Sequence, residues 1–234
     1  EKDAERFRRI GVAPEKVAVT GSVKFDVDIP EDVRAAAMAL RQELAGRPVW
    51  IAGSTHGSEN DQLLAAHGKV LAEHPGALLI LVPRHPDRFE PVAEKAVKEG
   101  LTLARRSLGE GPAQAQVYLG DTMGELMMLY GASDLAFVGG SLIERGGHNP
   151  LEPAGWGIPV FSGPHIFNFE TIYQSLLNDR GVKLVTDADD LAAHVSSLFS
   201  DGQEREAIGQ RALEVVNKNR GALDKVVDGI IERV

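Results

Sequence analysis

The stretch GGHNPLEPAGWGIPV, residues 146–160, combines residue types that could bind a phosphate group. It follows an apolar run and a glycine-rich loop in residues 134–141. We expect a helix that begins with Asn149 and Pro150, because a proline at the first helical position needs no amide hydrogen. The remaining free amides and the positive end of the helix dipole would attract an anion. Glu152 could accept hydrogen bonds from a pair of ribose hydroxyls, so the stretch predicts a nucleotide site.

A structural interpretation of the same residues is also open. A glycine turn, with Asn149 as a helix cap and Glu152 near the positive end of the helix dipole, would account for most of the pattern. It would not account for the density of polar residues and glycines. Loops at the carboxyl ends of strands carry ligands in open α/β sheets, and we therefore favour the ligand site.

Polar residues also follow the other expected strands, and parallel strands would bring them to one edge of the sheet. Arg84 comes directly after the apolar run LLILVP, and its planar guanidinium could hold a phosphate or a base carbonyl at two points. A salt bridge to a neighbouring acid is the alternative for Arg84. Gly124 and Glu125 stand at the expected start of a helix, where backbone amides and a carboxylate would face the same edge.

Four further residues have an ordinary structural interpretation beside the functional one. His148 could donate to a phosphate, or it could be a structural hydrogen bonder. Thr55 could touch a ligand or cap the next helix. His85 and Arg88 are expected on a solvated face.

The elements that would position these residues alternate regularly from residue 48 onward. Apolar strands, from PVWIAGST to VKLVTD, are separated by amphipathic helices. Unbroken apolar strands between such helices imply a parallel sheet covered on both faces, and we predict an α/β fold with about six strands in a doubly wound sheet.

The division of the chain follows from the same pattern. Residues 1–30 are expected to be an interdomain segment with a short strand at 17–21, and residues 31–202 a Rossmann-like domain. Residues 203–234 are expected to be C-terminal helices broken near Gly221.

Composition restricts the class of protein. The chain has 234 residues, of which 43% are hydrophobic, enough for a packed core. Its formal net charge of −9 argues against general binding of nucleic acid. It has no cysteine, which excludes disulfides and thiolate metal sites, and no apolar run approaches the ~20 residues that span a bilayer. It begins with Glu1 inside an expected charged helix, so we expect a soluble piece of a longer protein.

Several familiar motifs are missing from the chain, among them GxGxxG, GxxxxGK[ST], HExxH and GxSxG. The pairs Asp26 with Asp28 and Asp187 with Asp189 have a spacing found in metal sites. The first pair lies in a linker and the second at an expected helix cap, so we predict no metal.

Five segments of the chain together resemble a known family. The segments are VTGSVKFD, WIAGSTH, LLILVPRHPDRF, GDTMGELMMLYGASDLAFVGGSLIERGGHNPLEPAG and GPHIFNF. They resemble the C-terminal half of the bacterial 3-deoxy-D-manno-octulosonic acid (Kdo) transferases over nearly the whole chain. The resemblance implies the C-terminal domain of a GT-B glycosyltransferase, in which two Rossmann-like domains face each other and the C-terminal one holds the donor CMP-Kdo.

The resemblance also implies which residues contact CMP. They form three groups at strand ends: Pro83 and Arg84; Met123, Gly124 and Glu125; and Asn149, Pro150, Leu151 and Glu152. One departure is visible after the STH motif. The family has an acidic residue and then glycine after the histidine, whereas Gly57 and Ser58 follow His56 here, which leaves a direct role for that loop in doubt.

For the parent enzyme, the resemblance implies transfer of Kdo from CMP-Kdo to a lipid A precursor in lipopolysaccharide biosynthesis, at the cytoplasmic face of the bacterial inner membrane. The catalytic base, the membrane contact and much of the acceptor site would belong to an N-terminal half. We therefore expect this chain to bind the donor, to contain no catalytic residue and to need no cofactor.

Two alternatives remain at this stage. One is the domain of a GT-B glycosyltransferase or epimerase that uses a UDP-sugar. The other is a nucleotide-binding or interaction module without catalytic activity.

Overall fold

The computed structural model describes residues 2–231 and divides by its contacts into two compact units. The larger unit is Asp28–Val215, and the smaller one is Glu1–Val27 with Val216–Val234. Across residues 2–231, every helix falls short of the length and apolar character that crossing a bilayer requires.

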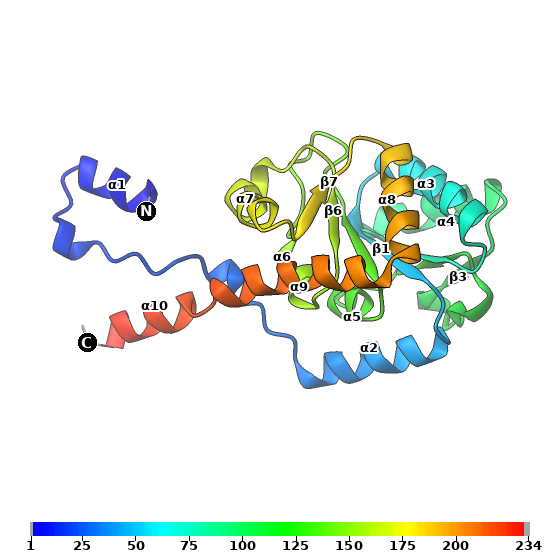
Figure 1. Cartoon of the computed structure of the whole chain (residues 1–234), viewed down its shortest axis with the longest axis horizontal. Coiled ribbons are helices and arrows are strands. Elements are labelled where there is room, and N and C mark those ends of the chain that lie inside the picture. Colours follow the sequence, from blue (N-terminus) through cyan, green and yellow to red (C-terminus); the bar gives the residue numbers. More distant parts are fainter. Residues whose placement is uncertain (1, 232–234) are drawn as a thin grey trace. The chain divides into compact units, whose positions relative to one another are not determined.

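The larger unit contains a seven-stranded sheet in which every neighbouring pair is parallel (Figure 1). The strand order is β3-β4-β2-β1-β5-β6-β7, so the doubly wound parallel sheet is confirmed, with one strand more than the expected six. The strands are β1 (Val49–Thr55), β2 (Leu78–Pro83), β3 (Leu103–Arg105), β4 (Val117–Leu119), β5 (Leu135–Val138), β6 (Val160–Ser162) and β7 (Val182–Leu184).

Helices cover both faces of this sheet, because side chains in the strands alternate between two apolar clusters. Trp50 and Ala52 of β1 face one cluster, and Val49 and Ile51 face the other. Helices α3, α4 and α8 cover the first face and α2 and α5 the second (Figure 1). The helices of this unit are α2 (Glu31–Glu43), α3 (Glu59–Glu73), α4 (Phe89–Lys98), α5 (Leu126–Gly131), α6 (Leu151–Gly155), α7 (Glu170–Asn178), α8 (Ala188–Ser200) and most of α9 (Gly202–Lys218).

The smaller unit contains α1 (Lys2–Arg9) and α10 (Ala222–Ile231). Asp26 caps α10, since its carboxylate accepts hydrogen bonds from the amides of Gly221 at 2.5 Å and Leu223 at 2.7 Å. The prediction of a strand at residues 17–21 is wrong, because a strand needs a hydrogen-bonded neighbour and this segment has none in the described structure. Residues 17–21 belong to no strand or bridge. The break near Gly221 is confirmed.

The unit boundaries differ from the predicted divisions after residues 30 and 202. Residues 203–215 belong to the larger unit because α9 packs closely there. A Cβ added at Gly209 would lie 2.0 Å from the carbonyl oxygen of Gly157, and one at Gly181 would lie 2.6 Å from the Cα of Ala212. Small residues on both sides therefore hold α9 against the body of this unit.

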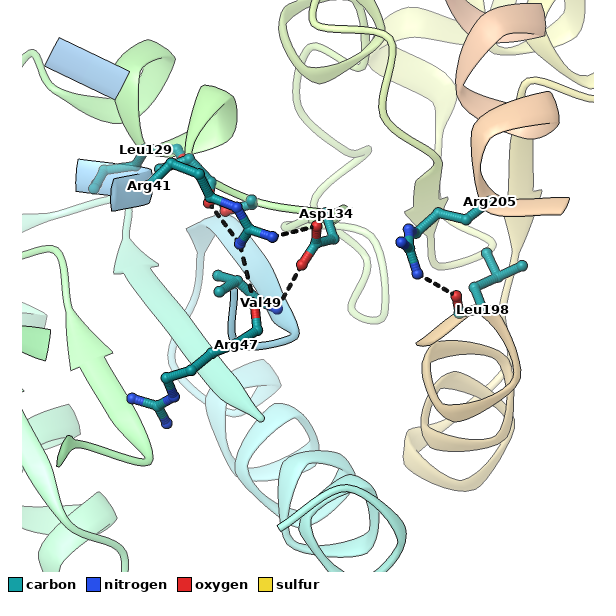
Figure 2. A network of polar contacts seen from close by, with 9 residues as sticks. Arg41, Arg47, Val49, Leu129, Asp134, Leu198 and Arg205 are labelled. Carbon is teal, nitrogen blue, oxygen red and sulfur yellow. Dashed lines mark hydrogen bonds and ion pairs between the residues drawn. The ribbon is translucent and has the colours of Figure 1, made fainter. Parts of the chain in front are cut away.

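An ion pair fixes the amino ends of two central strands (Figure 2). Asp134, just before β5, accepts a hydrogen bond from the amide of Val49 at 2.8 Å and pairs with the guanidinium of Arg41 in α2 at 2.8 Å. The Arg41 guanidinium also donates to the carbonyl of Arg47 at 3.2 Å. Strands β1 and β5 thus start in register, which places their carboxyl ends side by side.

Arg47 itself is a second connection within this unit, and its side chain points away from the Arg41 pair (Figure 2). Its guanidinium donates hydrogen bonds to backbone carbonyls that precede β2 and β4, and burial lowers its pKa. The acceptors are Gly76, Ala77, Pro112, Ala113 and Ala115.

We expect Arg47→Ala to lower the free energy of unfolding by about 2 kcal/mol, because several carbonyls lose a charged donor together. Urea unfolding followed by circular dichroism measures this change. Lys98→Ala, at the exposed end of α4, is the control, with an expected change within about 0.5 kcal/mol. Equal effects of the two substitutions would contradict the role given to Arg47.

Candidate functional site

A cavity of about 390 Å³ lies at the carboxyl ends of the central strands. Strand β1 stands between β2 and β5, and the chain leaves β1 toward β2 and later returns to the other side, so this is the point where the strand order reverses. Open α/β sheets bind ligands at such points. The lining residues are Ser54, Arg84, Gly124, Leu126, Met127, Tyr130, His148, Asn149, Glu152 and Phe169.

The floor of the cavity depends on close contact between the ends of β1 and β5. Ser54 has a φ of 55°, and the register between β1 and β2 shifts between Gly53 and Thr55. A Cβ added at Gly139 would lie 2.5 Å from the carbonyl oxygen of Ser54. Only glycine therefore fits at residue 139 without moving the backbone of Ser54.

A buried carboxylate organises the loop after β5. Glu59, in the first turn of α3, is fully buried and accepts four backbone hydrogen bonds from two loops. Burial raises the pKa of Glu59, and the four amides act in the opposite direction. The donors are the amides of His56 at 3.2 Å, Gly140 at 2.8 Å, Ser141 at 3.0 Å and Leu142 at 3.0 Å.

Glu59 was not among the residues that the sequence indicated. A partial signal exists, since a glutamate that reaches back to the amide three residues earlier is half of a capping box. The contacts with Gly140, Ser141 and Leu142 span more than 80 residues and have no local pattern. The amides after β5 are thus bound by the protein's own carboxylate.

The start of α6 differs from the expected helix. The helix begins at Leu151, and Pro150 precedes it instead of occupying its first position. Asn149, one residue before the N-cap Pro150, accepts a hydrogen bond from the amide of Leu151 through Oδ1 at 3.1 Å. Its Nδ2 donates to Glu152 Oε1 at 3.4 Å. Leu151 is buried, whereas Asn149 and Glu152 line the cavity.

Glu152 is a largely buried carboxylate in the cavity wall. Burial raises its pKa, while the hydrogen bond from Asn149 and the charge of Arg84 lower it. Two acceptor oxygens at this place suit a pair of neighbouring hydroxyl groups.

Arg84 is exposed at the end of β2 and lines the same cavity, next to the buried Pro83. Its backbone amide donates to the carbonyl of Thr55 at 2.9 Å, which fixes its position. Its guanidinium has no ion pair or hydrogen bond with any residue in the range 2–231 that the structure describes. The salt bridge offered as the alternative is therefore not found there, and the cation faces the cavity unneutralised.

Two histidines meet beside Arg84. The Nε2 atoms of His56 and His148 are 2.9 Å apart, and their rings are parallel within 4° with centroids 5.2 Å apart. His85 meets the His56 ring edge-on at 5.5 Å. Burial is the largest cause that lowers the pKa of both paired histidines, to about 4 for His148. The sequence indicated His148 but not its pairing with His56.

The segment before α5 contributes backbone and apolar side chains. Gly124 lines the cavity with a φ of 85°, a conformation that favours glycine, and Met123 is 63% exposed. The Glu125 carboxylate is paired with Arg106, with oxygen–nitrogen distances of 2.6 and 2.5 Å, and this pairing lowers the pKa of Glu125. Glu125 is not among the lining residues, so this acid fixes the segment that leads into α5.

Thr55 lies away from the cavity. It is fully buried, and its hydroxyl donates to Asn60 Oδ1 at 2.6 Å, which ties the end of β1 to α3. Elsewhere, the expected helix cap at Asp187 is confirmed, since Asp187 accepts from the amides of Asp189 and Asp190 at 2.9 Å.

Of the residues expected at the site, five share the cavity, namely Arg84, Gly124, His148, Asn149 and Glu152. The sequence did not indicate Tyr130 or Phe169, which belong to its wall. The wall thus joins a cation, a carboxylate and apolar side chains, the groups that a nucleotide with its phosphate, ribose and base requires.

Comparisons with known proteins give close relatives. No protein-family model matches the chain. The chain is 44% identical over 227 residues to the 3-deoxy-D-manno-octulosonic acid transferase of Haemophilus influenzae, covering 96% of this chain and 53% of that protein. It is 34% identical to the corresponding transferase of Bordetella pertussis, covering 98% and 54%. The chain thus spans about half the length of these curated relatives.

A solved structure matches most of this chain. The C-terminal CMP-Kdo binding domain of WaaA from Acinetobacter baumannii has a TM-score of 0.76 and 36% identity, covering 80% of this chain and 99% of that one. Anabaena HepE in complex with UDP and glucose has a TM-score of 0.60 at 16% identity, a likeness of fold alone.

Proposed function

Because the chain belongs to the family of 3-deoxy-D-manno-octulosonic acid (Kdo) transferases, we propose that its cavity binds the cytidine nucleotide of the sugar donor CMP-Kdo. The fold is that of the C-terminal domain of a GT-B glycosyltransferase. The observation that carries the proposal is the cavity at the reversal of strand order, where the unpaired Arg84 and the carboxylate of Glu152 line one wall.

Each part of the nucleotide has a complementary group in the cavity. Arg84 provides a cation for the phosphate in a chain whose net charge is −9. Glu152, held by Asn149, provides acceptors for the ribose hydroxyls. Leu126 and Phe169 belong to the apolar part of the wall, against which a base can pack.

In the whole enzyme, the proposed reaction is transfer of Kdo from CMP to a hydroxyl of a lipid A precursor, at the cytoplasmic face of the inner membrane. The transfer needs a base for the acceptor hydroxyl and cations for the departing CMP phosphate. On this proposal, the chain supplies the cations, and the base and the acceptor site belong to another part of the enzyme. We propose that no cofactor or metal takes part.

Calorimetric titration with CMP tests the proposed site. Arg84→Ala is expected to weaken CMP binding about ten-fold or more, because a charge-assisted contact with phosphate is lost. Glu152→Gln should weaken binding of both CMP and cytidine, since both carry the ribose. Arg88→Ala is the matched control, because Arg88 pairs with Asp87 at 3.2 Å and does not line the cavity.

CMP binding that is unchanged in the Arg84 and Glu152 variants would contradict the site. Competition with UMP separates the alternative donor, since a UDP-sugar enzyme would prefer the uridine nucleotide. Preference for UMP over CMP would overturn the assignment of the donor.

A further inference from the structure

We propose that Tyr130 makes the cavity specific for a ribonucleotide, because its hydroxyl forms a hydrogen bond with the ribose beside Glu152. This inference rests on the proposed function and adds to it a residue that the sequence did not indicate. It concerns the selection between CMP and its deoxy analogues, each of which lacks one ribose hydroxyl.

The hydroxyl of Tyr130 is a polar group at the cavity that the rest of the protein leaves unpaired. Tyr130, in α5, is 1% exposed and lines the cavity. Its hydroxyl makes no hydrogen bond to any residue in the range 2–231 that the structure describes, although every fully buried polar side-chain atom in that range has a partner. The hydroxyl oxygen is therefore not enclosed in the core, and it faces the cavity that Tyr130 lines.

The other two tyrosines of the chain are paired within the protein. The Tyr118 hydroxyl accepts a hydrogen bond from Arg106 Nη1 at 3.3 Å, and the Tyr173 hydroxyl accepts one from Ser162 Oγ at 3.0 Å. A hydroxyl that is taken out of water without a partner costs free energy, whereas phenylalanine would fill the same space without that cost. The hydroxyl of Tyr130 is therefore best explained by a polar group of a ligand that enters the cavity.

Strand β1 leaves room for this hydroxyl at Gly53. A Cβ added at Gly53 would lie 2.2 Å from the Tyr130 hydroxyl oxygen and 2.8 Å from Cζ of the same ring. Any other residue at position 53 would push the ring away from β1, because a packed interior has no space for the displaced atoms. Ser54, the next residue of β1, lines the cavity. The hydroxyl is thus held against β1, beside the floor of the cavity.

Glu152 is a charged neighbour of Tyr130, and both line the cavity. Burial raises the pKa of Tyr130, and the charges of Glu152 and Tyr173 raise it further, so the phenol keeps its proton at neutral pH. An ionised carboxylate only accepts hydrogen bonds, whereas a phenol hydroxyl can also donate. Two neighbouring ribose hydroxyls can therefore donate to Glu152 while one of them accepts from Tyr130. A nucleotide without that hydroxyl would leave a buried protein group unpaired, which is how such a site rejects it.

The test is calorimetric titration of CMP, 2′-deoxy-CMP and 3′-deoxy-CMP into the unaltered chain and into Tyr130→Phe, which removes only the hydroxyl. The unaltered chain is expected to bind CMP about ten-fold more tightly, or better, than at least one of the deoxy analogues. In Tyr130→Phe the same ratio should fall about ten-fold through weaker binding of CMP. The affinity for that analogue should stay the same, which also shows that the cavity is intact.

Tyr118→Phe is the matched control, because the Tyr118 hydroxyl is paired with Arg106 and Tyr118 does not line the cavity. Both affinity ratios should be the same in Tyr118→Phe as in the unaltered chain. A fall as large as that in Tyr130→Phe would assign the effect to a general loosening of the unit and would overturn the proposal.

Unchanged ratios in Tyr130→Phe, or an equal loss of affinity for all three nucleotides, would overturn the proposal while leaving nucleotide binding itself in place. An unaltered chain that binds both deoxy analogues as tightly as CMP would overturn it in the same way. An unaltered chain that binds none of the three nucleotides would overturn the proposed function as well.

Discussion

Glu59→Ala is expected to lower the free energy of unfolding by about 4 kcal/mol, because four amides, two of them buried, lose their acceptor at once. Glu59 is fully buried, so water cannot simply replace the carboxylate. The loop that begins at Gly140 leads to His148, and its disorder should also abolish tight binding of CMP. Urea unfolding and calorimetric titration measure the two effects.

Two further variants separate the acceptor from the volume of the side chain. Glu59→Gln keeps the size but turns an NH₂ group toward amide donors, so it should recover only part of the lost stability. Glu73→Ala removes an exposed glutamate from the last turn of the same helix and should change stability by no more than about 0.5 kcal/mol. If Glu59→Ala and Glu73→Ala were equally stable, the buried network would have no energetic role.

Much of the fold could be predicted because the strands are buried on both faces and therefore read as unbroken apolar runs, as in LLILVP of β2. The short run at residues 17–21 has the same local character, yet it remains unpaired. Local composition indicates that a segment can be extended. Whether a partner strand lies beside it depends on the rest of the chain.

The candidate site was likewise only partly predictable, because some of its contacts join residues far apart in the sequence. Arg84 was predicted because it follows a strand, and the carboxyl ends of parallel strands share one edge. Glu152 was predicted because it lies near the start of a helix that follows a strand and a glycine-rich loop. The partner of His148 is 92 residues away, and the amide of Gly140 is 81 residues from Glu59. No spacing in the sequence links such pairs. The acceptor that Glu59 provides for the amides of Gly140, Ser141 and Leu142 was therefore not predicted.

Gly139→Ala is the second substitution for which we expect a large effect. It should lower the free energy of unfolding by about 3 kcal/mol or more. The added Cβ would lie 2.5 Å from the carbonyl oxygen of Ser54 and 2.8 Å from the Cα of Thr55, so backbone must move. Because Ser54 lines the cavity, the same movement should weaken CMP binding in whatever protein remains folded.

The matched control for Gly139→Ala is a glycine substitution that should raise, not lower, the free energy of unfolding. Gly68 lies exposed in α3, and apart from its chain neighbours and the backbone of its own helix no atom lies within 4 Å of an added Cβ. Gly68→Ala should therefore raise the free energy of unfolding by about 0.5–1 kcal/mol through helix propensity. Both variants add one methyl group, and only the surroundings differ. A Gly139→Ala protein as stable as the Gly68→Ala protein would mean that β1 and β5 can separate at their carboxyl ends without cost. The cavity at that edge would then lack the rigid floor on which the placement of Arg84 and His148 depends.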